Sequence, residues 1–160
     1  MTHHRKHTFR PDCEGLEGRQ LLSWAIVSVN SDKVLDVRGR SKADGALVQQ
    51  WQWNGGRNQQ WYIIGLGNGA DAIESVNSGK VLDVKGASTA DGASVIQYHW
   101  HGGLNQQWDL IPLGAGEYVI ANVNSGKVLD VKGASKADGA SVIQYHWHAG
   151  YNQEWVFVSV

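Results

Sequence analysis

The chain has 160 residues, the length of one ordinary domain, and its 42% hydrophobic content is enough for a single core. Its 14 Lys and Arg residues balance 15 Asp and Glu residues, so no excess of positive charge draws it to nucleic acid or to an anionic membrane surface. No apolar run reaches the roughly 18 residues that a membrane-spanning helix needs, so we expect a soluble chain without membrane insertion.

Residues 1–22 lie outside the pattern that organises the rest of the chain, and we expect them to form a flexible tail. They lack the apolar stretch of roughly 7–15 residues that marks a secretory signal peptide. Residues Leu16 to Ser23 read Leu-Glu-Gly-Arg-Gln-Leu-Leu-Ser, which is similar to a short motif that introduces many bacterial surface or exported proteins. The resemblance implies a protein that is secreted or held at the cell surface.

From residue 23 onward, three copies of one unit follow each other at a step of 47 residues. Val-Asn-Ser, Val-Leu-Asp-Val, Asp-Gly and Asn-Gln-x-Trp return in the same order, the last as Asn58–Trp61 and Asn105–Trp108, and as Asn-Gln-Glu-Trp at Asn152–Trp155. We place the copies at about residues 23–69, 70–116 and 117–160. One unit should not fold alone, so all three are expected to share one core in a single domain over residues 23–160.

Each copy predicts four short strands. Segments rich in β-branched residues, such as Val81–Val84 and Ala93–Tyr98, are separated by turns of Asn, Asp, Ser and Gly, and helical spacing of apolar residues is not sustained anywhere. Three copies then supply twelve strands, and closing them into a barrel with a hairpin cap would remove exposed sheet edges. The predicted class is all-β with pseudo-threefold symmetry.

Gln-x-Trp follows Leu-Asp-Val and an Asp-Gly turn in each copy, and in this the chain resembles the ricin-type β-trefoil lectins from about Trp24 to Val160. The resemblance implies a β-trefoil of twelve short strands with one shallow sugar pocket per copy. In such a pocket an Asp after the second strand accepts hydrogen bonds from sugar hydroxyls. An aromatic ring beyond the Asp-Gly turn stacks on the sugar, and the Asn before Gln-x-Trp adds a polar contact.

The resemblance implies the same candidate carbohydrate-binding positions in each copy. By role, they are the acceptors Asp36, Asp83 and Asp130; the stacking rings Trp51, Tyr98 and Tyr145; the polar contacts Asn58, Asn105 and Asn152; the lip residues Asn54, His101 and His148; and the supporting Gln59, Gln106 and Gln153. The chemistry agrees, because a sugar presents hydroxyls around a patch of C–H bonds, which a carboxylate, an amide and a flat ring can bind.

The chain departs from the family in two ways. Members often carry a disulfide within each repeat, whereas the first copy has Val34 and Trp53 at those positions, and we expect a Val–Trp packing contact in its place. The first copy also has Trp51 where the others have Tyr, and Asn54 where the others have His. Its ligand preference or binding strength can therefore differ from theirs.

Other conspicuous residues have structural interpretations. The Trp of each Gln-x-Trp is expected in the core, and the Asp of each Asp-Gly pair (Asp44, Asp91 and Asp138) is expected to form a turn. His99 and His101 have the spacing of a His-x-His metal pair, but the glycine-rich loop beside them supplies no third ligand. We therefore expect neither a metal ion nor another cofactor.

The sequence favours a carbohydrate-binding lectin with up to three equivalent sugar pockets and multivalent recognition of glycans or polysaccharides. An enzyme is not expected, because no nucleophile motif or phosphate-binding loop is present and like acids in like settings do not suit a glycosidase. Two alternatives stay open: a polysaccharide-binding module that acts beside a glycoside hydrolase, and a trefoil scaffold for protein interaction or inhibition. We expect a monomer.

Overall fold

A computed structural model describes residues 21–160, so the tail predicted for residues 1–22 lies almost wholly outside the described residues. The strands are β1 Trp24–Ser28, β2 Val34–Val37, β3 Val48–Trp51, β4 Trp61–Gly65, β5 Asp71–Ser75, β6 Val81–Val84, β7 Val95–Tyr98, β8 Trp108–Gly114, β9 Glu117–Asn122, β10 Val128–Val131, β11 Val142–Tyr145 and β12 Trp155–Ser159. The short 3₁₀ turns are η2 Arg38–Arg40, η3 Arg57–Gln59, η4 Lys85–Ala87, η5 Leu104–Gln106, η6 Lys132–Ala134 and η7 Tyr151–Gln153. No helix in residues 21–160 is long and apolar enough to cross a bilayer.

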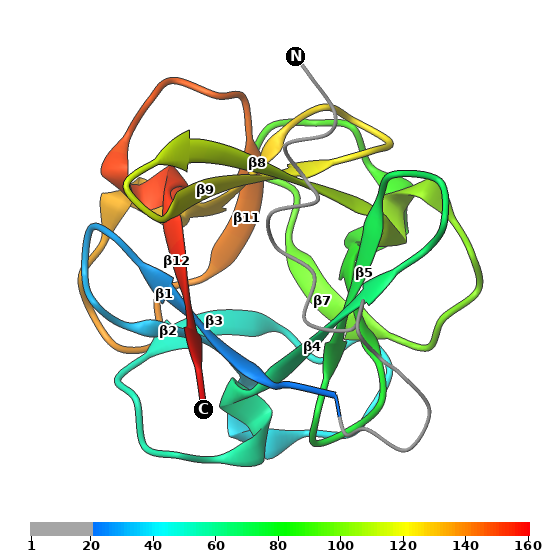
Figure 1. Cartoon of the computed structure of the whole chain (residues 1–160), viewed down its shortest axis with the longest axis horizontal. Helices are drawn as coiled ribbons and strands as arrows, with labels where there is room; N and C mark the ends of the chain where they lie inside the picture. The colour runs from blue at the N-terminus through cyan, green and yellow to red at the C-terminus, as the bar shows by residue number, and fades with distance from the viewer. Residues whose placement is uncertain (1–20) are drawn as a thin grey trace.

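The first and last strands of the three copies close into one ring. β1 pairs with β4, β4 with β5, β5 with β8, β8 with β9, β9 with β12 and β12 with β1, always antiparallel. The remaining strands form the hairpins β2–β3, β6–β7 and β10–β11, which Figure 1 shows around a common centre. The ring has no free edge. The predicted all-β class with twelve strands in a β-trefoil is confirmed.

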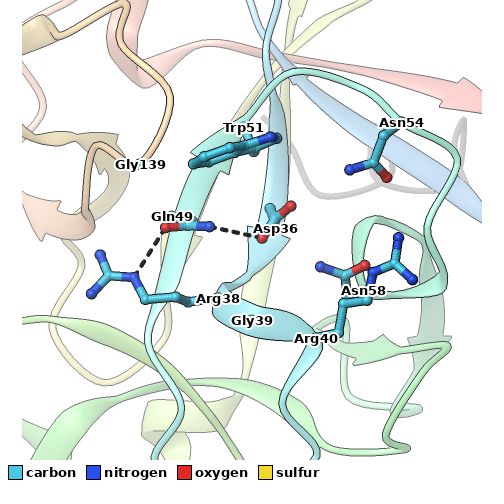
Figure 2. A pocket seen from close by; sticks show the side chains of 9 residues that line it. All are labelled: Asp36, Arg38, Gly39, Arg40, Gln49, Trp51, Asn54, Asn58 and Gly139. Atoms are coloured by element: carbon cyan, nitrogen blue, oxygen red, sulfur yellow. Dashed lines mark hydrogen bonds between the residues drawn. The ribbon is translucent and has the colours of Figure 1, made fainter.

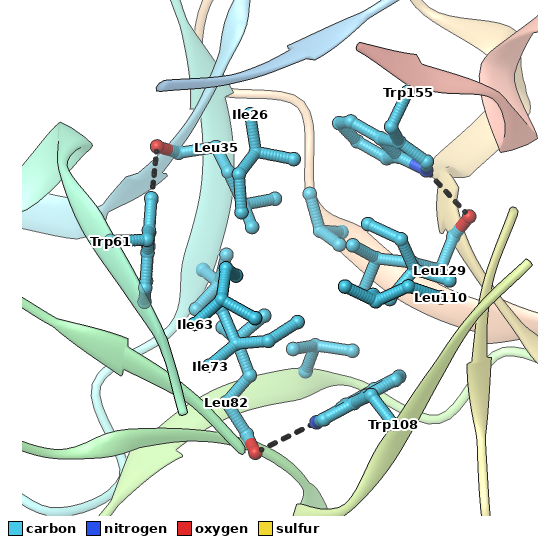
Figure 3. Packing of buried hydrophobic residues seen from close by; sticks show 14 of the residues in the cluster. Ile26, Leu35, Trp61, Ile63, Ile73, Leu82, Trp108, Leu110, Leu129 and Trp155 are labelled. Atoms are coloured by element: carbon cyan, nitrogen blue, oxygen red, sulfur yellow. Dashed lines mark hydrogen bonds between the residues drawn. The ribbon is translucent and has the colours of Figure 1, made fainter. Parts of the chain in front are cut away.

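The centre of the barrel is filled by equivalent residues from each copy. Trp61, Trp108 and Trp155 are fully buried, as are Leu35, Leu82 and Leu129. Each indole nitrogen donates to the carbonyl oxygen of the leucine in its own copy at 3.2 Å, as Figure 3 shows. A buried indole needs such a partner for its N–H group. The core position predicted for these tryptophans is confirmed.

A buried glutamine ties each copy to another one. The side chain of Gln97 on β7 donates from its amide nitrogen to the carbonyl oxygens of Ser41 and Ala43 in the first copy, both at 2.9 Å. Its amide oxygen accepts from Ser78 Oγ at 2.9 Å. The equivalent contacts run from Gln144 to Ser88 and Ala90, and from Gln50 to Ser135 and Ala137. The three glutamines thus connect second copy to first, third to second and first to third.

The tryptophan that stands eight residues before the Trp of Gln-x-Trp in each copy lies outside the core. Trp53, Trp100 and Trp147 keep 43%, 45% and 42% of their surface exposed, while Val34 is buried. The expected packing of Trp53 on Val34 would therefore bury only part of the indole. Hydrophobic stabilisation scales with the apolar area removed from water. A half-exposed indole therefore contributes less of the stability that a disulfide would give than a fully buried one would.

We expect Gln97→Met to lower the free energy of unfolding by about 1–3 kcal/mol, because a thioether cannot donate to the carbonyls of Ser41 and Ala43 and leaves Ala43 only the longer bond from the Ala46 N–H. Urea denaturation of both proteins at one pH measures the difference. The matched control is Gln52→Met, since Gln52 is exposed and the same substitution there should change stability by less than about 0.5 kcal/mol. Equal losses at the two positions would contradict the role given to Gln97.

Candidate functional site

Each copy has one surface pocket beside its β-hairpin. Their volumes are about 540, 390 and 440 Å³ in the first, second and third copy. The predicted residues among their linings are Asp36, Trp51, Asn54 and Asn58 in the first pocket; Asp83, Tyr98, His101 and Asn105 in the second; and Asp130, Tyr145, His148 and Asn152 in the third. The structure therefore brings together acceptor, ring, lip residue and asparagine in every copy. The supporting glutamines are not among the lining residues.

The carboxylate of each pocket forms part of its floor. In the second copy, Asp83 on β6 lies opposite Ile96 on β7 and is only 3% exposed. Its Oδ1 accepts from Asn105 Nδ2 at 3.2 Å, and its Oδ2 accepts from Gln106 Nε2 at 2.9 Å. Asp83 was expected to accept from sugar hydroxyls, and both of its oxygens already accept hydrogen bonds from amides. A carboxylate has about four lone-pair positions, so capacity for sugar hydroxyls remains.

Burial raises the pKa of the aspartate in the floor of each pocket. Desolvation raises the pKa of Asp83 above its ordinary 3.8, and the Gln106 amide and the His101 ring beside it oppose this shift only in part. His101 Nε2 lies 3.8 Å from Asp83 Oδ2. Desolvation likewise raises the pKa of Asp36 and of Asp130. The amides that donate to each carboxylate favour its ionised form and so limit this upward shift of the pKa.

The glutamine of Gln-x-Trp lies beneath the pocket and hydrogen-bonds to its aspartate and to its loop. Gln106 is fully buried and donates from Nε2 to the carbonyl oxygen of His99 at 2.8 Å as well as to Asp83. Its Oε1 accepts from the backbone N–H of His101 at 2.9 Å. Gln59 and Gln153 repeat this arrangement. Full burial places these glutamines behind the pocket, in the supporting position expected for them, and we describe them as positioning residues.

The aromatic ring ends the second strand of each hairpin and stays partly exposed. Tyr98 is the last residue of β7, with the His99 ring at 4.6 Å between centroids and His101 edge-on at 6.0 Å. Tyr145 has the same neighbours in the third copy. In the first copy, Trp51 at the end of β3 takes this place. A flat ring held in this way can stack on the C–H face of a sugar.

One wall of each pocket comes from a different copy. Gly45 lines the second pocket, Gly92 the third and Gly139 the first, each with a φ near +89° that favours glycine. Asp44, before Gly45, accepts from the His99 backbone N–H at 2.9 Å and lies 2.8 Å from His99 Nδ1. The predicted turn residue therefore also fixes the loop beside the neighbouring ring, a contact between copies that sequence reading missed.

The two histidines of the His-x-His pair face different partners. His99 contacts Asp44, whereas His101 lies at the pocket lip near Asp83. Within residues 21–160, no group of three or more His, Cys, Asp and Glu residues is arranged to hold a metal ion.

The first pocket has its own hydrogen-bond pattern, which Figure 2 shows. Gln49 stands where the other copies have Ile96 and Ile143, and its Nε2 donates to Asp36 Oδ1 at 3.1 Å. Arg38 Nε donates to Gln49 Oε1 at 3.0 Å. The amide of Asn58 donates to the Val37 carbonyl at 3.0 Å, whereas Asn105 and Asn152 also donate to the aspartate of their copies. A comparison of the aligned copies at position 49 would have revealed this difference.

These features define a β-trefoil with one polar, ring-walled pocket in each third. Residues 9–98 and 104–160 match the ricin-type beta-trefoil lectin domain-like family, and the chain belongs to that family. A search of curated proteins gives no match.

Several solved structures are similar to this chain. A designed threefold-symmetric protein, ThreeFoil, is 49% identical with a TM-score of 0.85, covering 86% of this chain and 99% of its own. An exo-beta-1,3-galactanase from Clostridium thermocellum is 40% identical with a TM-score of 0.86 over 88% of this chain, which spans only 31% of the galactanase. The Macrolepiota procera ricin B-like lectin, solved with lactose, is 22% identical with a TM-score of 0.74, covering 84% of this chain and 93% of its own, and shares the fold.

In the folded protein we expect Asp36, Asp83 and Asp130 to titrate above 3.8, because their burial disfavours the charged form. Between 3.8 and the raised pKa the folded state binds more protons than the unfolded state. These groups therefore lower the free energy of unfolding as pH rises through that window. Asp44 and Asp91 have the opposite effect on stability, because hydrogen bonds from His99 and His146 lower their pKa. The stabilisation that they give is present above the ordinary pKa of Asp and is lost as the pH falls through the lowered pKa.

Carbon-13 NMR of the side-chain carboxyl groups measures these midpoints one by one. Asp83→Asn assigns the Asp83 signal and removes its contribution to the pH dependence of stability. A midpoint for Asp83 at or below 3.8 would contradict the expected direction.

Proposed function

We propose that this protein is a carbohydrate-binding lectin in which each of the three pockets holds one sugar unit of a glycan. The observation that carries the proposal is the convergence, three times, of a carboxylate, an aromatic ring and an asparagine on one pocket. Membership of the ricin-type lectin family supports it. The domain would bind sugar without chemistry, because its acids recur in near-equivalent settings instead of forming an unlike pair.

In the second pocket, the carboxylate, the aromatic ring and the lip histidine would each contact a different part of the sugar. A sugar hydroxyl donates to a remaining lone pair of Asp83, and this charge-assisted bond is the strongest polar contact. The C–H face of the sugar stacks on Tyr98, while His101 at the lip exchanges hydrogen bonds with a further hydroxyl. Such a small and open site binds weakly. Three sites on one rigid body can raise the avidity for a multivalent glycan by roughly 10²–10⁴.

The rings offer a sharper test than the acids, because each acid also holds its pocket together. We expect the triple variant Trp51→Ala, Tyr98→Ala, Tyr145→Ala to stay folded and to lose roughly tenfold in affinity per pocket, which corresponds to about 1.4 kcal/mol for each ring. A glycan array identifies a ligand, and calorimetric titration with that ligand measures the loss.

The matched control for ring removal is Tyr62→Ala, which deletes a half-buried tyrosine outside the three pockets. Full glycan binding should remain in that protein. Unchanged binding in the triple variant would refute the site, and failure of the parent protein to bind any glycan would refute the function.

A polysaccharide-binding module that acts beside a glycoside hydrolase is the second candidate. It is favoured by the likeness to 31% of the chain of the exo-beta-1,3-galactanase from Clostridium thermocellum. If it is right, the protein should be retained on insoluble β-1,3-galactan and should not agglutinate glycan-bearing cells. Agglutination without retention on the polymer would favour the stand-alone lectin. Sedimentation with the polymer and a cell agglutination assay, each with the triple ring variant as control, separate the two.

A further inference from the structure

The turn that lines one side of each pocket differs in charge between the copies. Arg38 and Arg40 both line the first pocket. The equivalent positions hold Lys85 and Ala87 in the second pocket, and Lys132 and Ala134 in the third. Every pocket has one aspartate on its floor. The first pocket therefore carries one more positive charge than either of the others, and both of its cations are guanidinium groups.

Arg38 is oriented by a residue that only the first copy has. Its Nε donates to Gln49 Oε1 at 3.0 Å, and Gln49 in turn donates to Asp36. Isoleucine in the other copies cannot do this. This bond uses only Nε, so the terminal nitrogens of Arg38 remain available as donors. Asp36 accepts from Gln49 on one oxygen and from Gln59 on the other, so amides, not the arginines, satisfy it.

Arg40 is placed by an unusual backbone conformation. Its φ is 55°, and Ala87 and Ala134 have φ values of 54° and 53°, so the turn is the same in all copies and only the side chain differs. A left-handed conformation is uncommon for residues other than glycine and is found most often at functional sites. Figure 2 shows Trp51 on one side of the pocket and the Arg38–Gly39–Arg40 turn on the other.

No carboxylate of the described residues lies within 4.0 Å of either arginine side chain. Asp138, beside Gly139 in the pocket wall, accepts from the Gln52 backbone N–H at 2.9 Å and lies 4.0 Å from Lys33 Nζ. Arg38 and Arg40 are exposed, and no carboxylate of residues 21–160 forms an ion pair with either of them, although Arg40 lies near enough to Asp36 to lower the pKa of that carboxyl. The first pocket is also the largest, with about 540 Å³ of space.

We propose that the first pocket selects sugars that carry a carboxylate, as uronic acids do, while the second and third pockets show no such preference. This inference rests on the proposed function, because it assigns a ligand class to one of its three sites. The sugar ring stacks on Trp51, and its carboxylate accepts from the guanidinium group of Arg38 or of Arg40, which point to opposite sides of Asp36 in Figure 2. Guanidinium groups match the planar geometry of a carboxylate better than an ammonium group does.

The first pocket can be observed separately, because it alone uses a tryptophan as its ring. The indole N–H signal of Trp51, assigned with Trp51→Phe, reports binding there by NMR, while the ring signals of Tyr98 and Tyr145 report the other two. The probes are methyl β-D-glucuronide against methyl β-D-glucoside, and methyl β-D-galacturonide against methyl β-D-galactoside. Within each pair, only the group on C5 differs.

At Trp51, one of the uronides should bind about two- to fivefold more tightly than its neutral partner, a range typical of exposed ion pairs. At Tyr98 and Tyr145 the two members of that pair should bind alike. The preference at Trp51 should shrink as NaCl is raised to 0.5 M, because salt screens exposed charges.

Exchanging the turns between copies tests the arginines directly. The double variant R38K/R40A gives the first pocket the turn residues of the other two and should remove the preference. The converse triple variant K85R/A87R/I96Q, which also supplies the counterpart of Gln49, should create a preference in the second pocket, and the shared backbone conformation makes this graft feasible. The control K42A removes one exposed positive charge from outside the pockets and should keep the preference at Trp51.

Three results would overturn the inference. The first is equal binding of uronide and neutral glycoside at Trp51, and the second is a preference that survives R38K/R40A. The third is neutral sugar bound in the second and third pockets with no uronide bound in the first, which would leave the proposed function standing. If none of the probes or arrayed glycans binds in any pocket, the proposed function fails together with the inference.

Discussion

A buried amide that reaches from one copy into another is the contact on which the rest of the molecule depends. Gln97 donates to two carbonyls of the turn that precedes Gly45, and the Gly45 N–H donates to the Gln97 carbonyl at 2.8 Å. The turn is thereby fixed against β7. Only then can Asp44 meet His99 and Gly45 form the wall of the second pocket. The same polar contacts therefore join the copies and place the wall of the pocket.

Much of this architecture could be predicted, because the information is local or periodic. The 47-residue step, the short strands between Asn, Asp and Gly turns and the buried tryptophans each follow from residue type and spacing. Four of the five candidate positions in each copy do line one pocket. Their role in binding sugar remains a prediction.

What could not be predicted depends on contacts between copies or on burial. A repeat period does not say which copy the side chain of Gln97 reaches, so the wall supplied by Gly45 was not foreseen. Nor does the sequence show that Asp83 is nearly buried and already accepts from two amides, since that follows from the packing of the loop around Gln106. The partial exposure of Trp53 has the same origin, because its strand has ended and the loop turns outward.

The pockets vary without disturbing the core. Positions 38, 40, 49, 51 and 54 differ between the first copy and the others, yet the backbone of the turn is unchanged and the tryptophan and leucine at the centre are the same. The central residues are shared by all three copies, whereas the differences lie in residues that line the pockets. A repeat protein of this kind can therefore alter one pocket at a time.

The strand pairing between β1 and β12 has a consequence for how the chain can be connected. Trp24 lies opposite Ser159 and Ser28 opposite Trp155, so the beginning and the end of the trefoil run side by side. A short peptide could join them, and the chain could be reopened in an equivalent loop of another copy without breaking the ring. For the same reason the whole domain could be inserted into a surface loop of a host protein, since it enters and leaves at nearly one point.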